Sequence, residues 1–302
     1  MATPKEWDLL EFQQTAMEAI YMFMEQVEKE GYVLLKNMLT EEDLAPVIEV
    51  ISRHVDEMAE KFYKEGHIPE KFEHLSFVER WAKICSIYYK NVFIWNTEVF
   101  SREVYDLIRN PKLLAVVEQI LGPDIAANGD WWVRPKLPRE DITTLPWHQD
   151  SFYYGGKDAW NPDFKLLSVW IPLVDVDHIN GCLQVIPGSN HWGRIPCEMN
   201  ELKQLVPSIN VEEKGEVLTM QMNKGDILLF NQTTMHRSLP NHSDHIRWNI
   251  DLRYSPAGQA LTWHRDPDLN LRFPNLVARS KTNPANETSW EDWHRRHLNR
   301  KI

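Results

Sequence analysis

The sequence has few cysteines and no long apolar run. Its three cysteines, Cys85, Cys182 and Cys197, are widely spaced and form no CxxC pair. This pattern indicates neither a disulfide framework nor a thiolate zinc site, and it favours a reducing compartment. No window approaches the roughly 18 apolar residues of a membrane helix. The first residues also lack the basic and apolar regions of a secretory signal. We therefore expect a cytoplasmic protein.

The chain also has fewer basic than acidic residues. The chain has 33 Lys and Arg against 44 Asp and Glu, which gives a formal net charge of −11 at pH 7. This charge repels phosphate backbones and anionic membranes, so a nucleic-acid or membrane partner would require a local basic patch. The longest basic cluster, at 294–301, is better explained as the positive end of a terminal helix. We expect neither a nucleic-acid partner nor a membrane partner. A chain of 302 residues can bury a large core. We expect the protein to be a monomer or a homodimer.

The first 122 residues are expected to be mainly helical. Apolar residues recur at helical spacing over 12–29, and a capping-box pattern opens an amphipathic helix over about 40–65. Ser101 and Asn110 each precede a shorter helix. Between the first two helices, the apolar run at 31–36 predicts a strand.

From residue 124 onward, the apolar pattern changes to short runs separated by Gly, Pro, Asn and Asp, which is typical of strands. Turns at 223–226 and 240–244 are predicted to close two hairpins. Strands at this spacing suit two packed antiparallel sheets. We expect a mainly β fold, a double-stranded β-helix of the jelly-roll or cupin-like kind, flanked by N-terminal α-helices. The predicted strands are 130–134, 166–171, 182–186, 217–222, 227–230 and 247–254.

No segment has the composition of a flexible linker. We therefore expect a single domain over 1–302. Within it, 1–122 forms the helical flank, 123–258 forms the jelly-roll core, and 259–302 forms a C-terminal extension with a capped helix starting at 288–289.

Four His-x-Asp triplets are candidates for a metal site, because residues i and i+2 of a strand share one face. The triplet at 54–56 lies in the predicted long helix, where residues two apart point about 200° apart and cannot bind one ion. The triplet at 242–244 lies in a polar turn, and that at 264–266 lies outside the strand pattern. We expect none of these three to bind a metal.

The fourth triplet has a different context. His148 and Asp150 follow a Pro-Trp pair, and His236 comes directly after the buried-looking run at 227–235. Two imidazoles and one carboxylate can form a facial triad that leaves open positions on Fe(II). On spacing alone, the alternative that these are hydrogen-bonded polar residues of the core remains open.

An arginine near this triad suggests an anion site. If the turn at 240–244 closes a hairpin, Arg247 lies opposite His236, about 5 Å away. Its guanidinium would then hold the free end of a dicarboxylate that chelates the metal. Arg253 lies about 20 Å further along the strand and is the poorer candidate. The alternative for Arg247 is a surface ion pair with Asp251.

In this order, these residues resemble the phytanoyl-CoA dioxygenase family of Fe(II)- and 2-oxoglutarate-dependent oxygenases. The resemblance extends over most of the chain, and the combination of motifs is far more specific than one His-x-Asp triplet. The matching segments are 30–35, 145–150, 166–173, 180–191, 224–230 and 236–247.

The resemblance implies a set of site residues. It makes His148, Asp150 and His236 the catalytic iron ligands, and it makes Arg247 the partner of the distal carboxylate of 2-oxoglutarate. It adds the following co-substrate residues: Ser238, Trp170 and Gln149. For Trp170 and Gln149, the alternatives of a core aromatic and a strand polar residue remain open.

The resemblance also implies the reaction. An oxidoreductase of this family uses Fe(II), 2-oxoglutarate and O2, with ascorbate as the reductant in vitro, and it releases succinate and CO2. Members that halogenate replace the carboxylate ligand with a small residue, so the presence of Asp150 favours hydroxylation of a C–H bond. Desaturation, epimerisation and ring formation use the same ligands and stay open.

The expected substrate is a small organic molecule. The chain has 13 Trp, and aromatic residues both precede and follow the fourth triplet, so Trp132, Tyr153 and Tyr154 are candidates to line its pocket. Strand alternation would send Trp131 and Trp132 to opposite faces. The negative net charge argues mildly against a coenzyme A thioester.

Three alternatives to the oxygenase remain. A structural protein that has lost activity is the least favoured of them, because all four expected site residues are present. A zinc hydrolase can use the same three ligands but needs no arginine beside them. A cupin-like module can bind metal without turnover.

Overall fold

We describe the fold from a computed structural model. It describes residues 6–8, 16–88, 95–154, 163–201, 204–259 and 274–300. The helices are α2 (Ala16–Glu30), α3 (Glu41–Lys64), α4 (Arg80–Ile87), α5 (Arg102–Ile108), α6 (Pro111–Leu121) and α8 (Trp290–Leu298). The first strands are β1 (Glu6–Asp8), β2 (Tyr32–Lys36), β3 (Asp124–Ala127), β4 (Trp132–Lys136), β5 (Leu167–Pro172) and β6 (Leu183–Val185). The later strands are β7 (Cys197–Met199), β8 (Leu205–Pro207), β9 (Leu218–Met220), β10 (Ile227–Asn231), β11 (His236–Ser238), β12 (Arg247–Pro256) and β13 (Leu276–Ser280).

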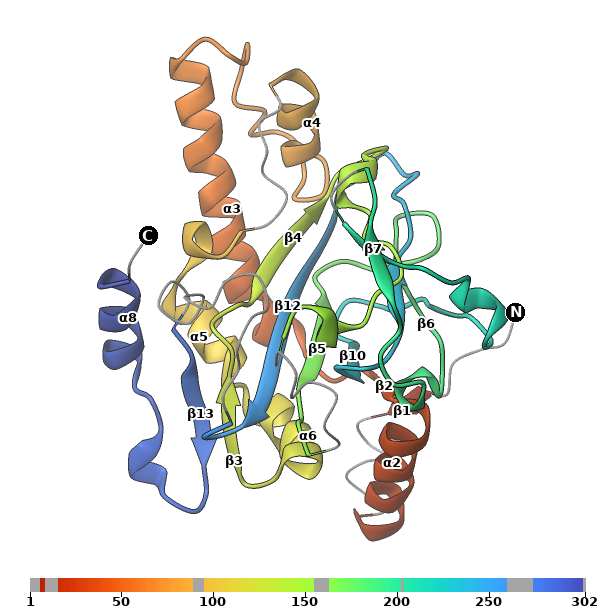
Figure 1. Cartoon of the computed structure of the whole chain (residues 1–302). Helices are drawn as coiled ribbons and strands as arrows, with labels where there is room; N and C mark the ends of the chain where they lie inside the picture. Colours follow the sequence, from red (N-terminus) through yellow and green to blue (C-terminus); the bar gives the residue numbers. More distant parts are fainter. Residues whose placement is uncertain are drawn as a thin grey trace.

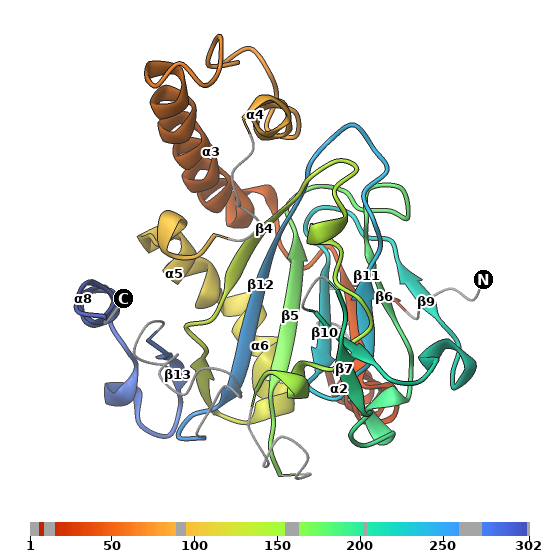
Figure 2. The same ribbon diagram turned by 45° about the horizontal axis from the view of Figure 1, so that its top comes forward.

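Two sheets form the β part of the molecule. The larger sheet has the order β1-β2-β10-β5-β12-β3-β13, and β4 also pairs with β12. The smaller sheet has the order β11-β6-β9, and β7 and β8 form a separate pair. Figure 2 shows β12, β5 and β10 side by side, with β11, β6 and β9 beyond them. Two antiparallel sheets flanked by helices confirm the predicted fold class.

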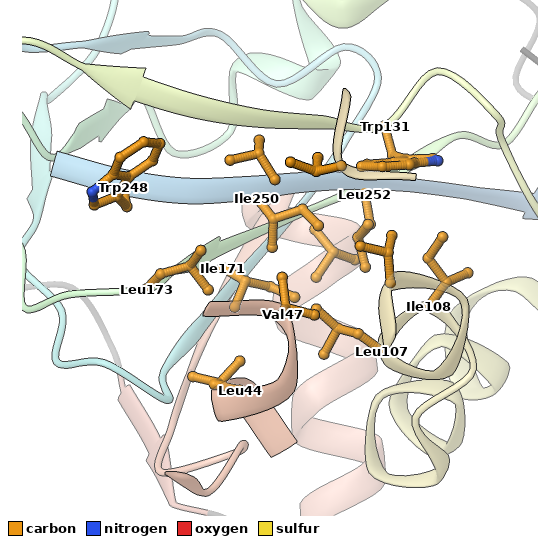
Figure 3. Close-up of a cluster of buried hydrophobic side chains, with 14 of the residues drawn as sticks. Leu44, Val47, Leu107, Ile108, Trp131, Ile171, Leu173, Trp248, Ile250 and Leu252 are labelled. Carbon is orange, nitrogen blue, oxygen red and sulfur yellow. The ribbon is translucent and has the colours of Figure 1, made fainter. Parts of the chain in front are cut away.

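Helices α3, α5 and α6 cover one face of the larger sheet (Figure 1). Figure 3 shows Ile250 and Leu252 of β12 directed at the helices, where they approach Val47 of α3 and Leu107 of α5. All four side chains are buried. Each such side chain stabilises the fold by about 1.5–3 kcal/mol relative to exposure.

Strand β12 alternates between this core and the opposite face. Trp248, Ile250 and Leu252 belong to the core cluster. The residues between them, Arg247, Asn249, Asp251 and Arg253, line a cavity instead. Because side chains of a strand point alternately to its two faces, β12 separates the core from the cavity.

The helix-start signals in the sequence are confirmed. Thr40 forms a capping box with Asp43 at the start of α3. The side chains of Ser101, Asn110 and Ser289 accept backbone hydrogen bonds at the starts of α5, α6 and α8. Such caps satisfy backbone N–H groups that have no partner within the helix.

Both predicted hairpins are wrong. The turn at 223–226 joins β9 of the smaller sheet to β10 of the larger one, and the segment around 240–244 joins β11 to β12 in the same way. Strand β11 pairs with β6, while β12 pairs with β3, β4 and β5. A turn signal shows that the chain reverses, but it does not show that the two flanking strands pair.

Segments from outside the predicted jelly-roll core also join the larger sheet. Strand β2 pairs with β10, and β13 pairs with β3.

Among the described residues, no helix is long and apolar enough to cross a membrane.

Candidate active site

A cavity of about 280 Å³ lies between the two sheets. Its lining comes from β4, β5 and β12 of the larger sheet, from β11 and β6 of the smaller one, and from the segment at 142–154. Small-molecule sites in proteins are typically concave and largely apolar, with a few convergent polar groups.

The structure brings His148, Asp150 and His236 together in this cavity. His236 begins β11, and its backbone forms two hydrogen bonds with the backbone of His148, at 2.9 and 3.0 Å. Asp150 begins a 3-10 turn, Asp150–Phe152. The Oδ1 atom of Asp150 lies 3.8 Å from Nε2 of each histidine. One donor atom from each residue lies within 4.8 Å of the other two, so these atoms can share one ion.

Backbone carbonyls fix the tautomer of both imidazoles. Nδ1 of His148 donates to Pro146 O at 2.8 Å, and Nδ1 of His236 donates to Thr234 O at 3.0 Å. Because a carbonyl oxygen can only accept, Nδ1 carries the proton in each ring and Nε2 keeps its lone pair for a metal.

The protonation states of all three groups also suit a metal. Burial and then the neighbouring His236 lower the pKa of His148 to about 3. Burial likewise lowers the pKa of His236. Burial alone would raise the pKa of Asp150, but Arg253 and the two imidazoles bring it below its usual value. Two neutral imidazoles and one carboxylate form the donor set that Fe(II) accepts on one face.

Asp150 presents only one oxygen to the histidines. Its Oδ2 accepts hydrogen bonds from Ser168 Oγ and from Arg253 Nε, the latter at 3.4 Å. Oδ1 alone therefore remains directed at the two imidazoles. Partners of this kind orient a ligating carboxylate and hold it in place.

Arg253 also reaches the cavity. It was the poorer candidate from the sequence, because it lies six residues after Arg247. It is buried against Tyr154 and donates from Nη1 to Asp130 O at 3.1 Å. Burial alone would lower its pKa, but Tyr154 and the carboxylates of Asp150 and Asp130 raise it. The cavity extends along β12 from Arg247 to Arg253, so both arginines contribute to it. No sequence pattern predicted the contact with Asp150, because it joins β12 to a 3-10 turn that lies 103 positions earlier in the chain.

Arg247 also lines the cavity, although not by the predicted pairing with His236. It pairs across β12 and β4 with Lys136. Its Nη1 donates to Asn249 Oδ1, and its guanidinium lies 5.3 Å from the ring centre of Trp170. Its Nε is buried without a hydrogen-bond partner, and no carboxylate among the described residues forms an ion pair with it.

Arg247 is a buried cation that forms no ion pair within the described residues. Burial lowers its pKa to about 10. The nearby Asp251 does not pair with it, because that carboxylate binds Arg134. A buried guanidinium with an orphaned N–H is the feature expected of an arginine that receives an anionic ligand.

The remaining predicted co-substrate residues differ in their placement. Ser238 and Trp170 line the cavity. Gln149 is fully buried, and its amide bonds to backbone groups of Gly193, Thr233 and Ile195. Its amide thus fastens the loop that carries the metal ligands to the chain around it.

The predicted substrate residues, Trp132, Tyr153 and Tyr154, all line the cavity. Trp131 points the other way into the core, as strand alternation predicted. The hydroxyl of Tyr154 donates to Asp130, and burial raises the pKa of this carboxyl. Sequence reasoning missed Asp130, Ser168 and Lys136, because each reaches the site from a different strand or its flank.

The two other triplets within the described residues lie away from the cavity. His54 is in α3, where its ring packs edge-on against Trp95. Asp244 is exposed and pairs with Arg139. The triplet at 264–266 falls outside the described residues.

Comparison with known proteins agrees with this site. The sequence profile of the phytanoyl-CoA dioxygenase (PhyH) family matches residues 27–249. The chain belongs to the phytanoyl-CoA dioxygenase family. A PhyH-family match of this length includes the segments that carry all three candidate ligands and Arg247.

Two curated proteins are similar to this chain in sequence. The chain is 31% identical to 1-deoxypentalenic acid 11-beta-hydroxylase of Streptomyces exfoliatus over 50% of its own length and 56% of that protein. It is 24% identical to ectoine dioxygenase of Bordetella parapertussis over 78% of its own length and 74% of that protein. The match thus spans little more than half the length of the hydroxylase.

The fold is also similar to that of a solved structure. The epimerase SnoN in complex with Fe3+, alpha ketoglutarate and nogalamycin RO superposes with a TM-score of 0.55. The sequences are 17% identical, and the match covers 82% of this chain and 86% of that one. At this identity the likeness establishes the shared fold.

Proposed function

We propose that this protein is a non-haem Fe(II)- and 2-oxoglutarate-dependent dioxygenase that hydroxylates a C–H bond of a small organic molecule. The observation that carries the proposal is the buried His148, Asp150 and His236 cluster, with both Nε2 atoms and one carboxylate oxygen facing each other. Membership of the PhyH family supports the same activity.

In this proposal, His148, Asp150 and His236 hold the iron. When bound, iron with 2-oxoglutarate and O2 supplies the oxidant for the C–H bond, and succinate and CO2 are released. The protein contributes orientation. Carbonyl groups fix the imidazole tautomers, while Ser168 and Arg253 keep one carboxylate oxygen away from the ion.

The same proposal places the distal carboxylate of 2-oxoglutarate at Arg247 and Ser238, beside Trp170. The orphaned Nε of Arg247 supports this placement, because a carboxylate accepts two parallel hydrogen bonds from a guanidinium. Gln149 would act indirectly, by fastening the ligand-bearing loop.

The substrate would occupy the part of the cavity walled by Trp132, Tyr153 and Tyr154. Flat aromatic walls suit an apolar or ring-containing molecule. The name of the Streptomyces relative, which describes the hydroxylation of a carboxylic acid, supports hydroxylation as the outcome.

We propose further that 1–302 acts as one oxygenase domain, as a monomer or homodimer in the cytoplasm. The pairing of β2 and β13 with the larger sheet supports the single domain, because the flanking segments complete the sheet that bears Arg247.

The proposal is tested by incubating purified protein with Fe(II), ascorbate and 2-oxoglutarate in air, with and without a library of small molecules. We expect slow succinate release that library members accelerate, together with a product 16 mass units heavier than its substrate. A product that is isomeric with its substrate or two hydrogens lighter would replace hydroxylation by epimerisation, ring formation or desaturation. Metal binding without succinate release would favour a module that binds without turnover.

A further inference from the structure

A buried lysine lies behind the proposed co-substrate site. Lys136, the last residue of β4, is 1% exposed. Its Nζ donates to Ser238 Oγ at 3.0 Å, to Thr143 O at 3.0 Å and to Thr144 Oγ1 at 3.2 Å. All three partners are uncharged. Lysine is rarely buried to this extent without a carboxylate partner.

The surrounding chain is shaped around this side chain. A Cβ at Gly181 would lie 2.7 Å from Cε of Lys136 and 2.7 Å from Leu239 O, so only glycine leaves room for the lysine. Gly181 also has a φ of +94°, which favours glycine. In the described part of the chain, no carboxylate forms an ion pair with Lys136.

The hydrogen bonds of Ser238 show what the lysine does. A serine hydroxyl has two acceptor lone pairs and one hydrogen to donate. Ser238 Oγ accepts from Lys136 Nζ at 3.0 Å and from Leu145 N at 2.9 Å, which uses both lone pairs. Its own hydrogen finds no acceptor within the described residues, and the side chain borders the cavity. The hydroxyl is therefore held as a donor toward a ligand.

We propose that Lys136 is a positioning residue for the distal carboxylate of the 2-oxo acid. By occupying an acceptor position of Ser238, it forces the serine hydroxyl to donate to that carboxylate, and it adds a positive charge behind the bond. The site would thereby select a 2-oxo acid with a second carboxylate over one that ends in a methyl group. This inference rests on the proposed function, because it assumes that 2-oxoglutarate binds at Arg247.

The charge of Lys136 depends on an anion beside it. Burial, and then the nearby Arg247 and Arg134, lower the pKa of Lys136 well below its usual value, which disfavours the ammonium, and a bound carboxylate would raise this pKa and favour the charged form. Of these three cations, only Arg134 has an ion-pair partner within the described chain, Asp251. A bound carboxylate would compensate the two remaining charges, whereas a methyl group would leave both unpaired.

The test compares two ligands on two variants by calorimetric titration. Protein is loaded with Mn(II), which permits binding without turnover, and is titrated with 2-oxoglutarate and with 2-oxopentanoate, which has a methyl group in place of the distal carboxylate. We expect Lys136→Met to raise the Kd for 2-oxoglutarate about tenfold, because a charge-assisted hydrogen-bond network loses its cation. We expect the Kd for 2-oxopentanoate to change less than about twofold, because this ligand makes no use of that network.

A double variant tests the route through Ser238. In the Ser238→Ala background, we expect Lys136→Met to raise the Kd for 2-oxoglutarate less than about threefold. The effects of the two substitutions should not add, because the two residues act as a unit. Lys224→Met, which removes a lysine paired with Glu41 on the surface, is the matched control and should change neither ligand. If Lys136→Met fails to fold by circular dichroism, Lys136→Gln replaces it, because its amide can still donate to Thr143 O.

Each other outcome has a definite meaning. If the Lys136 variant loses affinity for both ligands to the same extent, Lys136 has a structural role only, and the inference is overturned. Full additivity with Ser238→Ala would overturn the route through serine. If the wild-type protein shows no Mn(II)-dependent binding of 2-oxoglutarate, the proposed function fails, and the inference falls with it.

Discussion

At the scale of single residues, the site depends on how each ligand is held. Asp150 is the clearest case, because one oxygen faces the histidines while the other binds Ser168 and Arg253. The resemblance to the PhyH family pointed to Asp150 itself. It did not indicate Arg253, because the contact joins residues 103 positions apart.

The ligand assignment makes a direct prediction. His148→Ala and Asp150→Ala each remove one of three donors, so both variants should lose stoichiometric Fe(II) binding in anaerobic equilibrium dialysis. His54→Ala and His242→Ala alter triplets outside the cavity and should bind iron as the wild type does. Wild-type iron affinity in both ligand variants would refute the assignment.

Arg253 should matter for the metal, although it is not a ligand. Arg253→Met frees Oδ2 of Asp150 and leaves a buried carboxylate without its cation, so we expect metal affinity to fall about 10- to 100-fold. The control is Arg237→Met, because Arg237 also lines the cavity but pairs with Glu212. Competition with a metal-chelating dye measures both variants. Equal affinities in the two would assign Arg253 a packing role only.

Substitution of Arg247 should weaken the binding of the co-substrate and leave the affinity for the metal unchanged. Arg247→Lys keeps the charge but loses the fork of donors, so we expect the KM for 2-oxoglutarate to rise about tenfold. Iron affinity should stay at the wild-type value, because Arg247 contacts neither histidine nor Asp150. A fall in kcat at an unchanged KM would place the distal carboxylate elsewhere.

At the scale of secondary-structure elements, the sequence located most strands and helices but not their pairing. The predicted strand at 247–254 corresponds to β12, Arg247–Pro256, and its alternation correctly separated core from polar residues. The turns at 223–226 and 240–244 were recognised, yet each leads into the other sheet. Turn residues respond to local backbone conformation, whereas strand pairing depends on long-range packing.

This difference explains why the co-substrate arginine was found for a reason that proved wrong. The predicted hairpin placed Arg247 beside His236, but the two residues lie on different sheets and share only the cavity that both line. The family resemblance pointed to the same arginine independently of that pairing. Lys136 could not be found from sequence, because its role depends on the pairing of β4 with β12.

The turn before β6 gives a prediction at this scale. Gly181→Ala should destabilise the fold by about 2–4 kcal/mol, because the new Cβ meets Leu239 O and the Lys136 side chain and the backbone has a positive φ. Gly66→Ala is the matched control: its φ is +74° but nothing lies within 4 Å of the added Cβ, so we expect about 1–2 kcal/mol from backbone strain alone. Urea denaturation measures both. Equal losses would show that the space at Gly181 is not needed.

At the scale of the whole molecule, the candidate metal site lies between the two sheets and draws on both of them. His236 lies on the smaller sheet, while Ser168 and Arg253, which hold Asp150, lie on the larger one. An ion bound by the three ligands would therefore tie the sheets together. Binding to the native state alone stabilises a protein by mass action.

Metal loading should consequently raise the melting temperature. With Mn(II) at 100 times its dissociation constant, the stabilisation is about 2.7 kcal/mol, which corresponds to a shift of about 4 °C for a chain of 302 residues. EDTA should reverse the shift, and Asp150→Ala should show none. Differential scanning calorimetry gives the comparison. A similar shift in the alanine variant would locate the stabilising ion elsewhere.

The most direct test of the central claim is succinate formation from 2-oxoglutarate by the purified wild-type protein and by Asp150→Ala and Arg247→Met. We predict Fe(II)-dependent succinate release by the wild type, and none above background by either variant at low 2-oxoglutarate. At high 2-oxoglutarate, Arg247→Met should recover part of its rate while Asp150→Ala stays inactive, because only the latter lacks a metal ligand. Succinate release that persists in Asp150→Ala, or a wild type that binds iron and never releases succinate, would contradict the account.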